Sequence, residues 1–315
     1  MYDTFHDDLS DTRFPIKHGS GTMPAVGFGT LFRDLSLTTQ TVTAALDAGF
    51  RHFDTAERYR NEDAVGVAIQ QFLASEKGRR EDLFITGKLW NSNHRPERVE
   101  PAFEASCRRL QVDYMDCYII HTPFAFKPGD DQEPRDAFAH ILYDSGVTLI
   151  ETWRAMERLV DQGRAKSIGL SDIGLPALKE IVAQARIKPA VVQVEVHPYL
   201  PEWELLEFCR EQGIIVLAFA PLGHGMTPNV LQDPVLTAIA ARVNKTPAQV
   251  ALAWSVQRGV AFLTTSTSPA HIRENRDICT LPHMAMREIQ QDITTRVRFN
   301  SVVETGIPGF IAPKI

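Results

Sequence analysis

The sequence predicts an α/β fold, a (β/α)8 TIM barrel with an N-terminal β-hairpin, extra helices and a C-terminal loop over the active-site mouth. Three observations predict it. The length of 315 residues suits one large barrel domain. Short apolar runs alternate with longer amphipathic stretches, which indicates repeated β-α units around a parallel sheet. Eight such runs occur, and eight strands with partner helices make up this kind of barrel.

The predicted strands are short apolar runs that end in polar or turn residues. In chain order they are Ala25–Thr30, Arg51–Asp54, Leu83–Leu89, Tyr114–His121, Lys166–Ser171, Ala190–His197, Ile214–Pro221 and Val260–Thr264. Ahead of them, residues 11–24 contain Gly19 and Gly21 and predict a short hairpin that closes the bottom of the barrel.

Helical segments separate these strands. A threonine at its start and Gly49 after its end predict the first helix, Thr38–Ala48. Pro96 predicts the start of the third, because proline fits a first helical turn. The other predicted helices are Ala64–Phe72, Leu149–Gln162, Leu175–Ala185, Glu202–Gln212, Thr246–Gln257 and Ala270–Ile278, with an extra helix at Asp233–Val243. The longest irregular stretch, from Phe124 to about Gly146, has the length of a functional loop.

No shift in composition divides the chain, so we expect one barrel domain over residues 1–315, with residues 1–12 as a flexible extension. The acidic N-terminus has no features of a secretory signal, and no apolar run is long enough to span a membrane. A formal net charge of −6 offers no basic footprint for nucleic acid or anionic membrane. The four cysteines lack metal-ligand spacing. We therefore expect a cytoplasmic protein without a metal, whose partner is a small molecule.

Four polar side chains stand where predicted strands end. Asp54 ends the second strand, Lys88 lies near the end of the third, and His121 ends the fourth. Tyr59 follows Asp54 by five residues, on the loop into the next helix. Each residue alone could have a purely structural role, such as capping a loop or packing as a structural histidine. Because the active site of a TIM barrel is built at these strand ends, their coincidence favours catalysis.

The four residue types suit proton donation to a developing alkoxide. A phenol with a pKa of about 10 is a poor acid at neutral pH. We expect the ammonium of Lys88 to lower the pKa of Tyr59, and Asp54 to keep Lys88 charged and oriented. His121 can hydrogen-bond a substrate carbonyl and orient it. The sequence therefore predicts Tyr59 as the general acid.

Longer segments resemble the aldo-keto reductase family. They are DAGFRHFDTAERYRNEDAVGVAI, FITGKLW, DYMDCYIIHTP, AKSIGLSD, VVQVEVHPYL, LAFAPLG and QVALAWSVQRGV, in that family's order over residues 20–280. The resemblance implies reduction of an aldehyde or ketone with NADPH, or alternatively NADH, and makes the four residues above the catalytic tetrad. It implies a monomer, with a dimer as the alternative. It also implies an extended cofactor without a Rossmann domain, and Gly27-Phe28-Gly29 indeed lacks the full GxGxxG spacing.

The resemblance assigns cofactor contacts by position. Ser171, Asp172 and Gln193 are expected to hold the nicotinamide carboxamide, and Phe219 to stack on the nicotinamide ring. The other cofactor-binding residues that it implies are Gly29, Thr30, Asp54, Ala220, Pro221, Leu222, Gly223, Thr264, Thr265, Ser266, Thr267, His271, Glu274 and Asn275.

The chain departs from the family pattern at the cofactor. Asp172 stands where asparagine is frequent, and Phe219 where tyrosine is usual. Thr264-Thr265-Ser266 and His271 replace the lysine and arginine that hold the 2′-phosphate in many NADPH-specific members, which leaves NADH open. Arg273 and Arg276 are nearby cations. Only about ten residues separate Gly223 from Asp233, so we expect weak clamping of the cofactor.

The predicted substrate pocket is wide. Leu31-Phe32 and Thr122 stand where the family often has larger aromatic side chains. The predicted lining is Leu31, Phe32, Tyr59, Trp90, His121, Thr122, Phe124 and Phe310. A relatively bulky carbonyl substrate is therefore expected.

Two other functions stay open. A lyase would use Lys88 as a Schiff-base nucleophile, which needs a depressed lysine pKa that the neighbouring Asp54 disfavours. A non-catalytic barrel could instead bind the nicotinamide cofactor as a sensor or channel partner. The presence of all four tetrad residues favours turnover.

Overall fold

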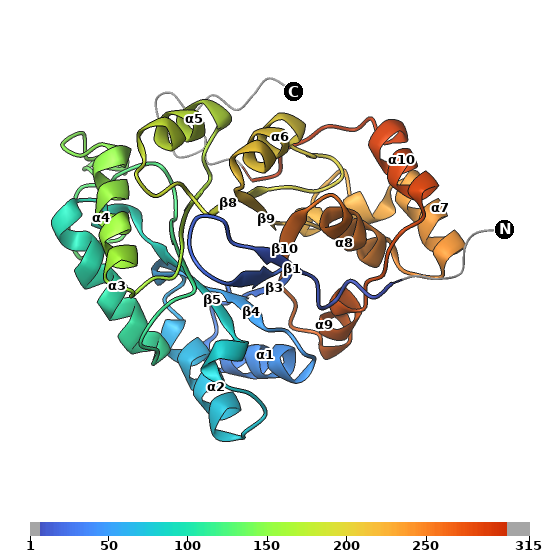
Figure 1. The fold of residues 1–315 in the computed structure, drawn as a ribbon, viewed down its shortest axis with the longest axis horizontal. Coiled ribbons are helices and arrows are strands. Elements are labelled where there is room, and N and C mark those ends of the chain that lie inside the picture. Colours follow the sequence, from blue (N-terminus) through green and yellow to red (C-terminus); the bar gives the residue numbers. More distant parts are fainter. Residues whose placement is uncertain (1–6, 301–315) are drawn as a thin grey trace.

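The computed structural model describes residues 7–300, and eight parallel strands in it close into a barrel (Figure 1). The barrel strands are β3 (Val26–Gly29), β4 (His52–Asp54), β5 (Phe84–Leu89), β6 (Cys117–Ile120), β7 (Ile168–Ser171), β8 (Val191–Glu195), β9 (Ile215–Phe219) and β10 (Val260–Thr264). Each strand pairs with the next in sequence, and β10 closes the ring by pairing with β3. All eight predicted strands are confirmed.

A hairpin covers the N-terminal end of the barrel. It consists of β1 (Arg13–Pro15) and β2 (Thr22–Pro24), paired antiparallel, and it lies in front of the barrel in Figure 1. Its turn is fastened to the barrel, because Ser20 N donates to Lys166 O at 3.2 Å. Gly19 makes this approach possible, since a Cβ there would lie 2.6 Å from Lys166 O. The predicted hairpin is confirmed.

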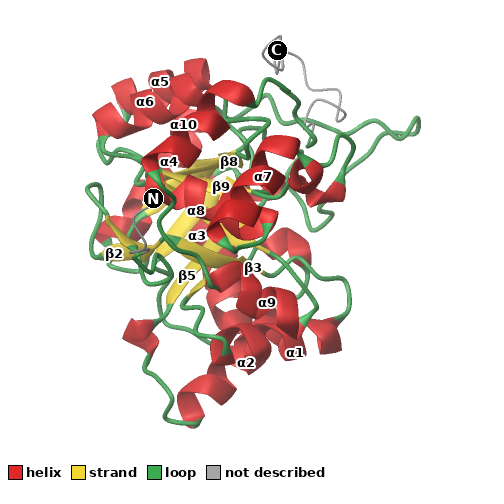
Figure 2. Cartoon of the chain, turned by 90° about the vertical axis from the view of Figure 1, so that its right-hand side faces the viewer, coloured by secondary structure: helices red, strands yellow, loops and turns green. Residues whose placement is uncertain are grey.

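Helices surround the strands (Figure 2). The partner helices are α1 (Leu35–Asp47), α2 (Glu62–Ala74), α3 (Pro96–Leu110), α4 (Leu149–Asp161), α5 (Leu175–Gln184), α6 (Trp203–Gln212), α8 (Pro247–Gln257) and α9 (Pro269–Arg276). The predicted extra helix is confirmed as α7 (Pro234–Val243), but α10 (His283–Asp292) was missed. Helix α10 buries only Ala285 and Ile289 and has no side-chain cap, so its pattern is weak. None of the described helices is long and apolar enough to cross a membrane.

Two local predictions were wrong. Helix α1 begins a turn earlier than Thr38, because Asp34 caps it by accepting from Leu37 N at 2.9 Å. Thr38 instead donates its hydroxyl to Asp34 O at 2.8 Å. Residues 7–12 are hydrogen-bonded rather than free, since Leu9 N donates to Ile278 O at 3.0 Å. Residues 1–6 lie outside the described part of the chain.

Burial extends along the barrel strands as far as the mouth of the barrel. Every residue of β5 is buried, and that includes Lys88, whose side chain has no exposed surface. Lysine is almost never fully buried unless it is paired. The burial of Lys88 therefore identifies the mouth as the place where polar contacts concentrate.

Candidate active site

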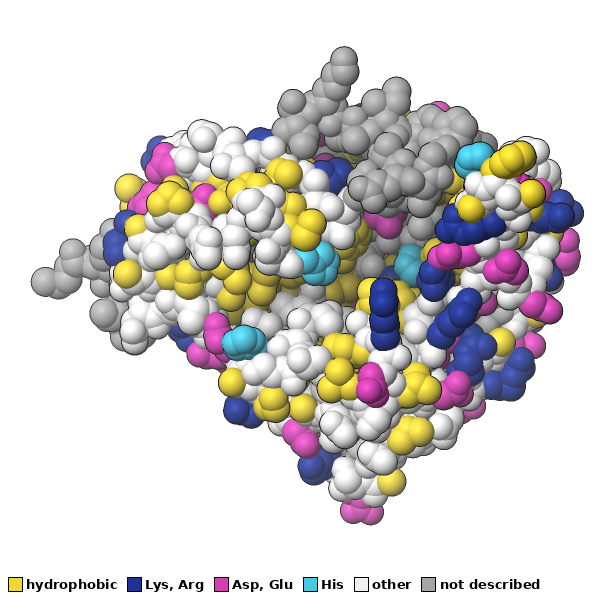
Figure 3. Space-filling view, turned by 180° about the vertical axis from the view of Figure 1, so that it is seen from behind, with side chains coloured by type: hydrophobic (Ala, Val, Ile, Leu, Met, Phe, Trp, Pro, Cys, Tyr) yellow, Lys and Arg dark blue, Asp and Glu magenta, His cyan; other side chains and the backbone are white. Residues whose placement is uncertain are grey.

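A cavity of about 350 Å³ opens at the C-terminal ends of the strands. Figure 3 shows the face opposite the hairpin, where the surface is hollowed near its centre. The ends of six strands supply part of the lining, through Gly29, Asp54, Ser171, Gln193, Phe219 and Thr264. This is the end of a parallel barrel at which ligands bind.

Lys88 connects two other predicted tetrad residues. Its Nζ donates to Asp54 Oδ1, to Thr55 O at 3.0 Å and to Tyr59 Oη at 3.3 Å. The side chains of Lys88 and Asp54 are 0% and 2% exposed. Burial alone would lower the pKa of Lys88, but the charge of Asp54 and the contact with Tyr59 outweigh it and raise that pKa. Lys88 therefore stays an ammonium ion, which disfavours a Schiff-base role.

The second oxygen of Asp54 has a partner that the sequence did not predict. Gln193 Nε2 donates to Asp54 Oδ2 at 2.7 Å, so the carboxylate is held on both sides. Apart from the cofactor role that the family resemblance assigned to it, the only signal for Gln193 was a polar residue in the middle of the strand VVQVE. Its pairing across the barrel could not be deduced from that pattern.

Tyr59 lies on a single 3-10 turn, Glu57–Tyr59. Burial raises the pKa of Tyr59 above its ordinary value of 10.0, and Lys88 opposes this only in part. The predicted lowering of this pKa was therefore wrong in direction, because the sequence showed the lysine but not the depth of burial. The phenol keeps its proton and can donate it.

His121 completes the group. Its ring centroid lies 5.8 Å from that of Tyr59 and 5.1 Å from that of Trp90, both edge-to-face. Burial, with Lys88 and Arg58 as further causes, lowers the pKa of His121 well below its usual value. The imidazole is therefore neutral and carries one N–H. All four residues that the sequence singled out lie together, and Asp54, Tyr59 and His121 line the cavity.

Most of the predicted cofactor residues meet at the same cavity. Its lining includes Gly29, Thr30, Asp54, Ser171, Asp172, Gln193, Phe219, Ala220, Pro221, Leu222, Thr264 and Thr265. The lining also includes five residues that were missed, namely His224, Gly225, Leu231, Leu263 and Asn300. Apart from Leu263, which lies in β10, the missed residues lie outside the barrel strands, and their positions depend on how these segments pack in the folded protein.

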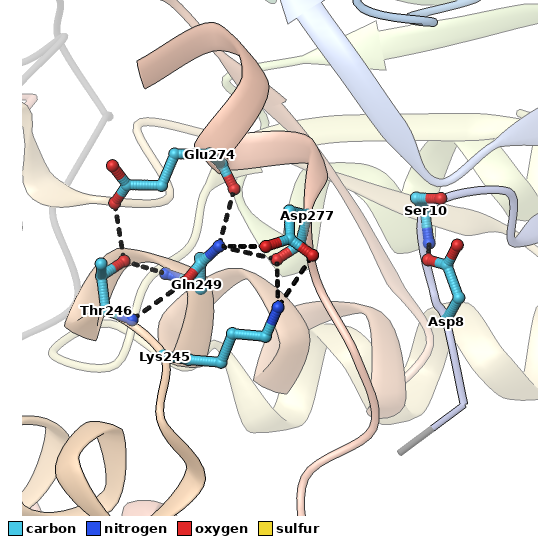
Figure 4. A network of polar contacts seen from close by, with 7 residues as sticks. All are labelled: Asp8, Ser10, Lys245, Thr246, Gln249, Glu274 and Asp277. Carbon is cyan, nitrogen blue, oxygen red and sulfur yellow. Dashed lines mark hydrogen bonds and ion pairs between the residues drawn. The ribbon is translucent and has the colours of Figure 1, made fainter. Parts of the chain in front are cut away.

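Six predicted cofactor residues do not line this cavity, namely Gly223, Ser266, Thr267, His271, Glu274 and Asn275. A Cβ at Gly223 would lie 2.7 Å from Val230 Cγ2, so this residue packs against its own loop. Glu274 Oε1 accepts from Thr246 Oγ1 at 2.7 Å. Figure 4 shows Glu274 in a network that fastens α9 to α8, together with Gln249, Lys245 and Asp277. The Glu274 carboxylate therefore faces α8 rather than the cavity.

Only some of the predicted substrate residues lie at the cavity. Leu31 lines the cavity and is 60% exposed. Phe32 is not part of the lining, because its side chain is buried with its ring 6.4 Å from that of Phe28. Thr122 is also outside the lining, since its Oγ1 donates to Asn91 Oδ1 at 2.9 Å. Trp90 and Phe124 are not part of the lining, and Phe310 lies outside the described residues.

The donor set of the cavity fits a nicotinamide. Ser171, Asp172 and Gln193 place hydroxyl, carboxyl and amide groups on one wall, near the aromatic ring of Phe219. Burial raises the pKa of Asp172 from 3.8 to about 7, so near neutrality its carboxyl can donate as well as accept. Thr264 Oγ1 is buried without a partner among the described residues, which leaves it available to a ligand.

Comparison with known proteins decides the family. The model of the Aldo/keto reductase family matches residues 25–293. The chain belongs to this family.

Similar aldo-keto reductases cover most of the chain. Aldo-keto reductase family 1 member A1-A of Danio rerio is 44% identical over 264 residues, which is 81% of each chain. Estradiol 17 beta-dehydrogenase 5 of Mus musculus is 41% identical over 269 residues, or 81% of this chain and 83% of the relative. The structure of the aldose reductase from Schistosoma japonicum has a TM-score of 0.86 and 36% identity, and the match covers 91% of this chain and 93% of that one.

This aldo-keto reductase is an NADPH-dependent oxidoreductase that acts on small carbonyl substrates. The predicted fold, reaction class and cofactor are confirmed. The lyase and the non-catalytic barrel have no support in the relatives.

Proposed function

We propose that this aldo-keto reductase reduces a bulky aldehyde or ketone to the alcohol, with Tyr59 as general acid. The observation that carries this proposal is the position of the Lys88 ammonium. It lies between the Asp54 carboxylate and the Tyr59 hydroxyl, beside the neutral ring of His121. Three of these four side chains line the cavity at the strand ends.

Each residue has a distinct part in the reaction. NADPH, when bound, supplies the hydride to the carbonyl carbon. His121 donates a hydrogen bond to the carbonyl oxygen and orients it. Tyr59 transfers its Oη proton to that oxygen as negative charge develops there, so hydride and proton together give the alcohol. Lys88 stabilises the phenolate that remains, and Asp54, held in turn by Gln193, keeps Lys88 in place.

The proposed cofactor contacts follow the cavity wall. Ser171, Asp172 and Gln193 would hold the carboxamide, and Phe219 would stack on the nicotinamide. Thr264, Thr265 and Ser266, with Thr267, His271 and Asn275, would face the adenosine end. Arg276 pairs with Asp11 at 2.5 Å, whereas Arg273 is an exposed residue of α9, so we propose Arg273 as the cation that a 2′-phosphate would contact.

Two observations support a bulky substrate: the apolar lining of the cavity and the name of one relative. The mouse relative is named for estradiol, a fused-ring alcohol. Leu31, Leu222 and Leu231 provide apolar lining for rings of this kind. We propose a ring-bearing carbonyl compound.

A direct assay tests the proposal. The purified protein is given NADPH or NADH with a panel of aldehydes and ketones, and oxidation of the cofactor is followed. Tyr59→Phe should abolish most reduction while cofactor affinity, measured by fluorescence quenching, stays unchanged. Wild-type protein that consumes no cofactor with any member of the panel refutes the enzymatic function. Near-normal rates in Tyr59→Phe refute the acid assignment alone.

Three further predictions concern the protein as a whole. We predict a monomer, which light scattering during gel filtration would test against a dimer. We also predict that neither nucleic acid nor a membrane is a partner, and that the protein is cytoplasmic.

A further inference from the structure

The turn that carries Tyr59 has little support of its own. Glu57–Tyr59 forms one 3-10 turn, closed by a bond from Tyr59 N to Ala56 O at 3.0 Å. Arg60, which follows, adopts a left-handed conformation with φ 55° and donates its N–H to Glu57 O at 3.2 Å. Short 3-10 segments have poor hydrogen-bond geometry, so the position of Tyr59 depends on contacts from outside the turn.

The first outside contact is made by the Glu57 carboxylate. Its two oxygens accept from Asn93 Nδ2 at 2.8 and 3.1 Å, and Oε2 accepts from Trp90 N at 3.4 Å. Asn93 is fixed in turn, because its Oδ1 accepts from Arg98 Nε at 3.0 Å. Glu57 therefore ties the Tyr59 turn to the segment that directly follows Lys88 and β5.

The second outside contact comes from the long loop after β6. Gln132 Oε1 accepts from Arg60 Nε at 2.8 Å, and Gln132 Nε2 donates to Glu57 O at 3.4 Å. One side chain thus bonds to the first residue of the turn and to the residue that follows it. The Gln132 carbonyl oxygen also accepts from Trp90 Nε1 at 2.7 Å.

Neighbouring groups add further contacts between the loop after β6, the Tyr59 turn and Trp90. Glu133 pairs with Arg58, whose guanidinium lies 5.4 Å from the centroid of the Trp90 ring. The Trp90 ring itself packs edge-to-face on His121 at 5.1 Å. The contacts of Glu57 and Gln132 therefore connect the acid, the lysine segment and the histidine.

We propose that Glu57 and Gln132 are positioning residues for carbonyl reduction, and that they hold the Tyr59 hydroxyl against Lys88 and the substrate oxygen. The inference rests on the proposed acid role of Tyr59. Neither residue lines the cavity, so each acts through the turn rather than on the ligand. Small displacements of an acid reduce the rate steeply, because proton transfer needs near-ideal geometry.

The test uses Glu57→Ala and Gln132→Ala in the full chain. Asp130→Ala is the matched control, because Asp130 is an exposed residue of the same loop. We expect kcat to fall by about ten- to a hundredfold in the first two variants, with KM changed by less than about threefold. The isotope effect on kcat with deuterated NADPH should increase, because the chemical step becomes slower. Cofactor affinity by fluorescence quenching, and the control, should match the wild type.

Two further variants separate positioning from general loosening of the fold. Gln132→Glu keeps an acceptor for Arg60 and should recover part of the lost kcat. Glu57→Ala and Asn93→Ala should be non-additive in kcat when combined, because they break the same contact.

Unchanged kcat in both alanine variants overturns the inference, and so does a loss of kcat with an unchanged isotope effect and additive double mutants. Such results leave the proposed function standing, since the wild type still reduces carbonyls. Wild-type protein without reductase activity refutes both.

Discussion

Gln193 and Asp54 face each other across the barrel, and the amide of the first holds the carboxylate of the second at 2.7 Å. Asp54 Oδ1 belongs to Lys88 and Oδ2 to Gln193. A residue predicted only to hold the cofactor therefore also orders the ion pair behind Tyr59. The hydrogen bond between Gln193 and Asp54 thus connects the residues expected to bind the cofactor with the Lys88–Asp54 pair that supports Tyr59.

Removing this hydrogen bond should be costly. Gln193→Leu leaves Asp54 Oδ2 buried without its donor, which should lower the free energy of unfolding by about 1 to 3 kcal/mol. Both kcat and cofactor affinity should fall. Denaturant unfolding and steady-state kinetics measure these effects, with the exposed Gln184→Leu on α5 as control. A Gln193→Leu protein with wild-type stability would show that Asp54 does not need the amide.

The buried ion pair should behave as a unit. Lys88→Met leaves the Asp54 charge buried and unpaired, which should cost about 3 to 5 kcal/mol of stability at neutral pH. Adding Asp54→Asn removes that charge and should restore much of the loss, while both variants remain inactive. Thermal and denaturant unfolding of the single and double variants make the comparison. Equal stabilities for the two would contradict the pairing.

Asp172 should make stability depend on pH. Its pKa in the folded protein is about 7 against an ordinary 3.8, because burial, with Glu195 nearby, outweighs the attraction of Arg298 and Lys88. The folded state therefore holds the proton more tightly than the unfolded chain. The stability that this gives is complete below the unfolded pKa and is lost as the pH rises through about 7.

Asp172→Asn is the matched variant for this effect. Its melting temperature should decline less than that of the wild type between about pH 5 and about pH 8. Parallel melting curves over that range would show that Asp172 does not titrate there.

The phosphate end of the cofactor should respond to an added cation. Thr265→Lys places an ammonium ion beside the expected 2′-phosphate and should raise the preference for NADPH over NADH by about tenfold or more. The ratio of kcat/KM for the two cofactors is the measurement. Gln40→Lys, at an exposed position of α1, serves as a control for added charge. An unchanged ratio in Thr265→Lys would mean that other residues bind the phosphate.

The sequence predicted the tetrad because strand ends in a barrel share one mouth, so register along the chain is enough to bring Asp54 and His121 together. It predicted both Leu31 and Phe32 at the pocket, but it could not show that only Leu31 of these two adjacent loop residues lines the cavity. Nor could it show that the Glu274 carboxylate bonds to Thr246, because these two residues meet only when α8 and α9 pack together. The prediction that the pKa of Tyr59 is lowered was wrong for a similar reason, because the burial that raises this pKa arises only in the assembled barrel.

The network of Glu274, Thr246, Gln249, Lys245 and Asp277 bears on how cofactor choice can change. It fixes the C-terminal half of α9 and leaves the loop ahead of the helix, residues 265–268, outside the network. Substitutions in that loop can therefore alter the chemistry offered to the adenosine end while the helix keeps its place. Cofactor preference in this chain can therefore change through substitutions in the loop alone, without any change in the residues that fix α9 to α8.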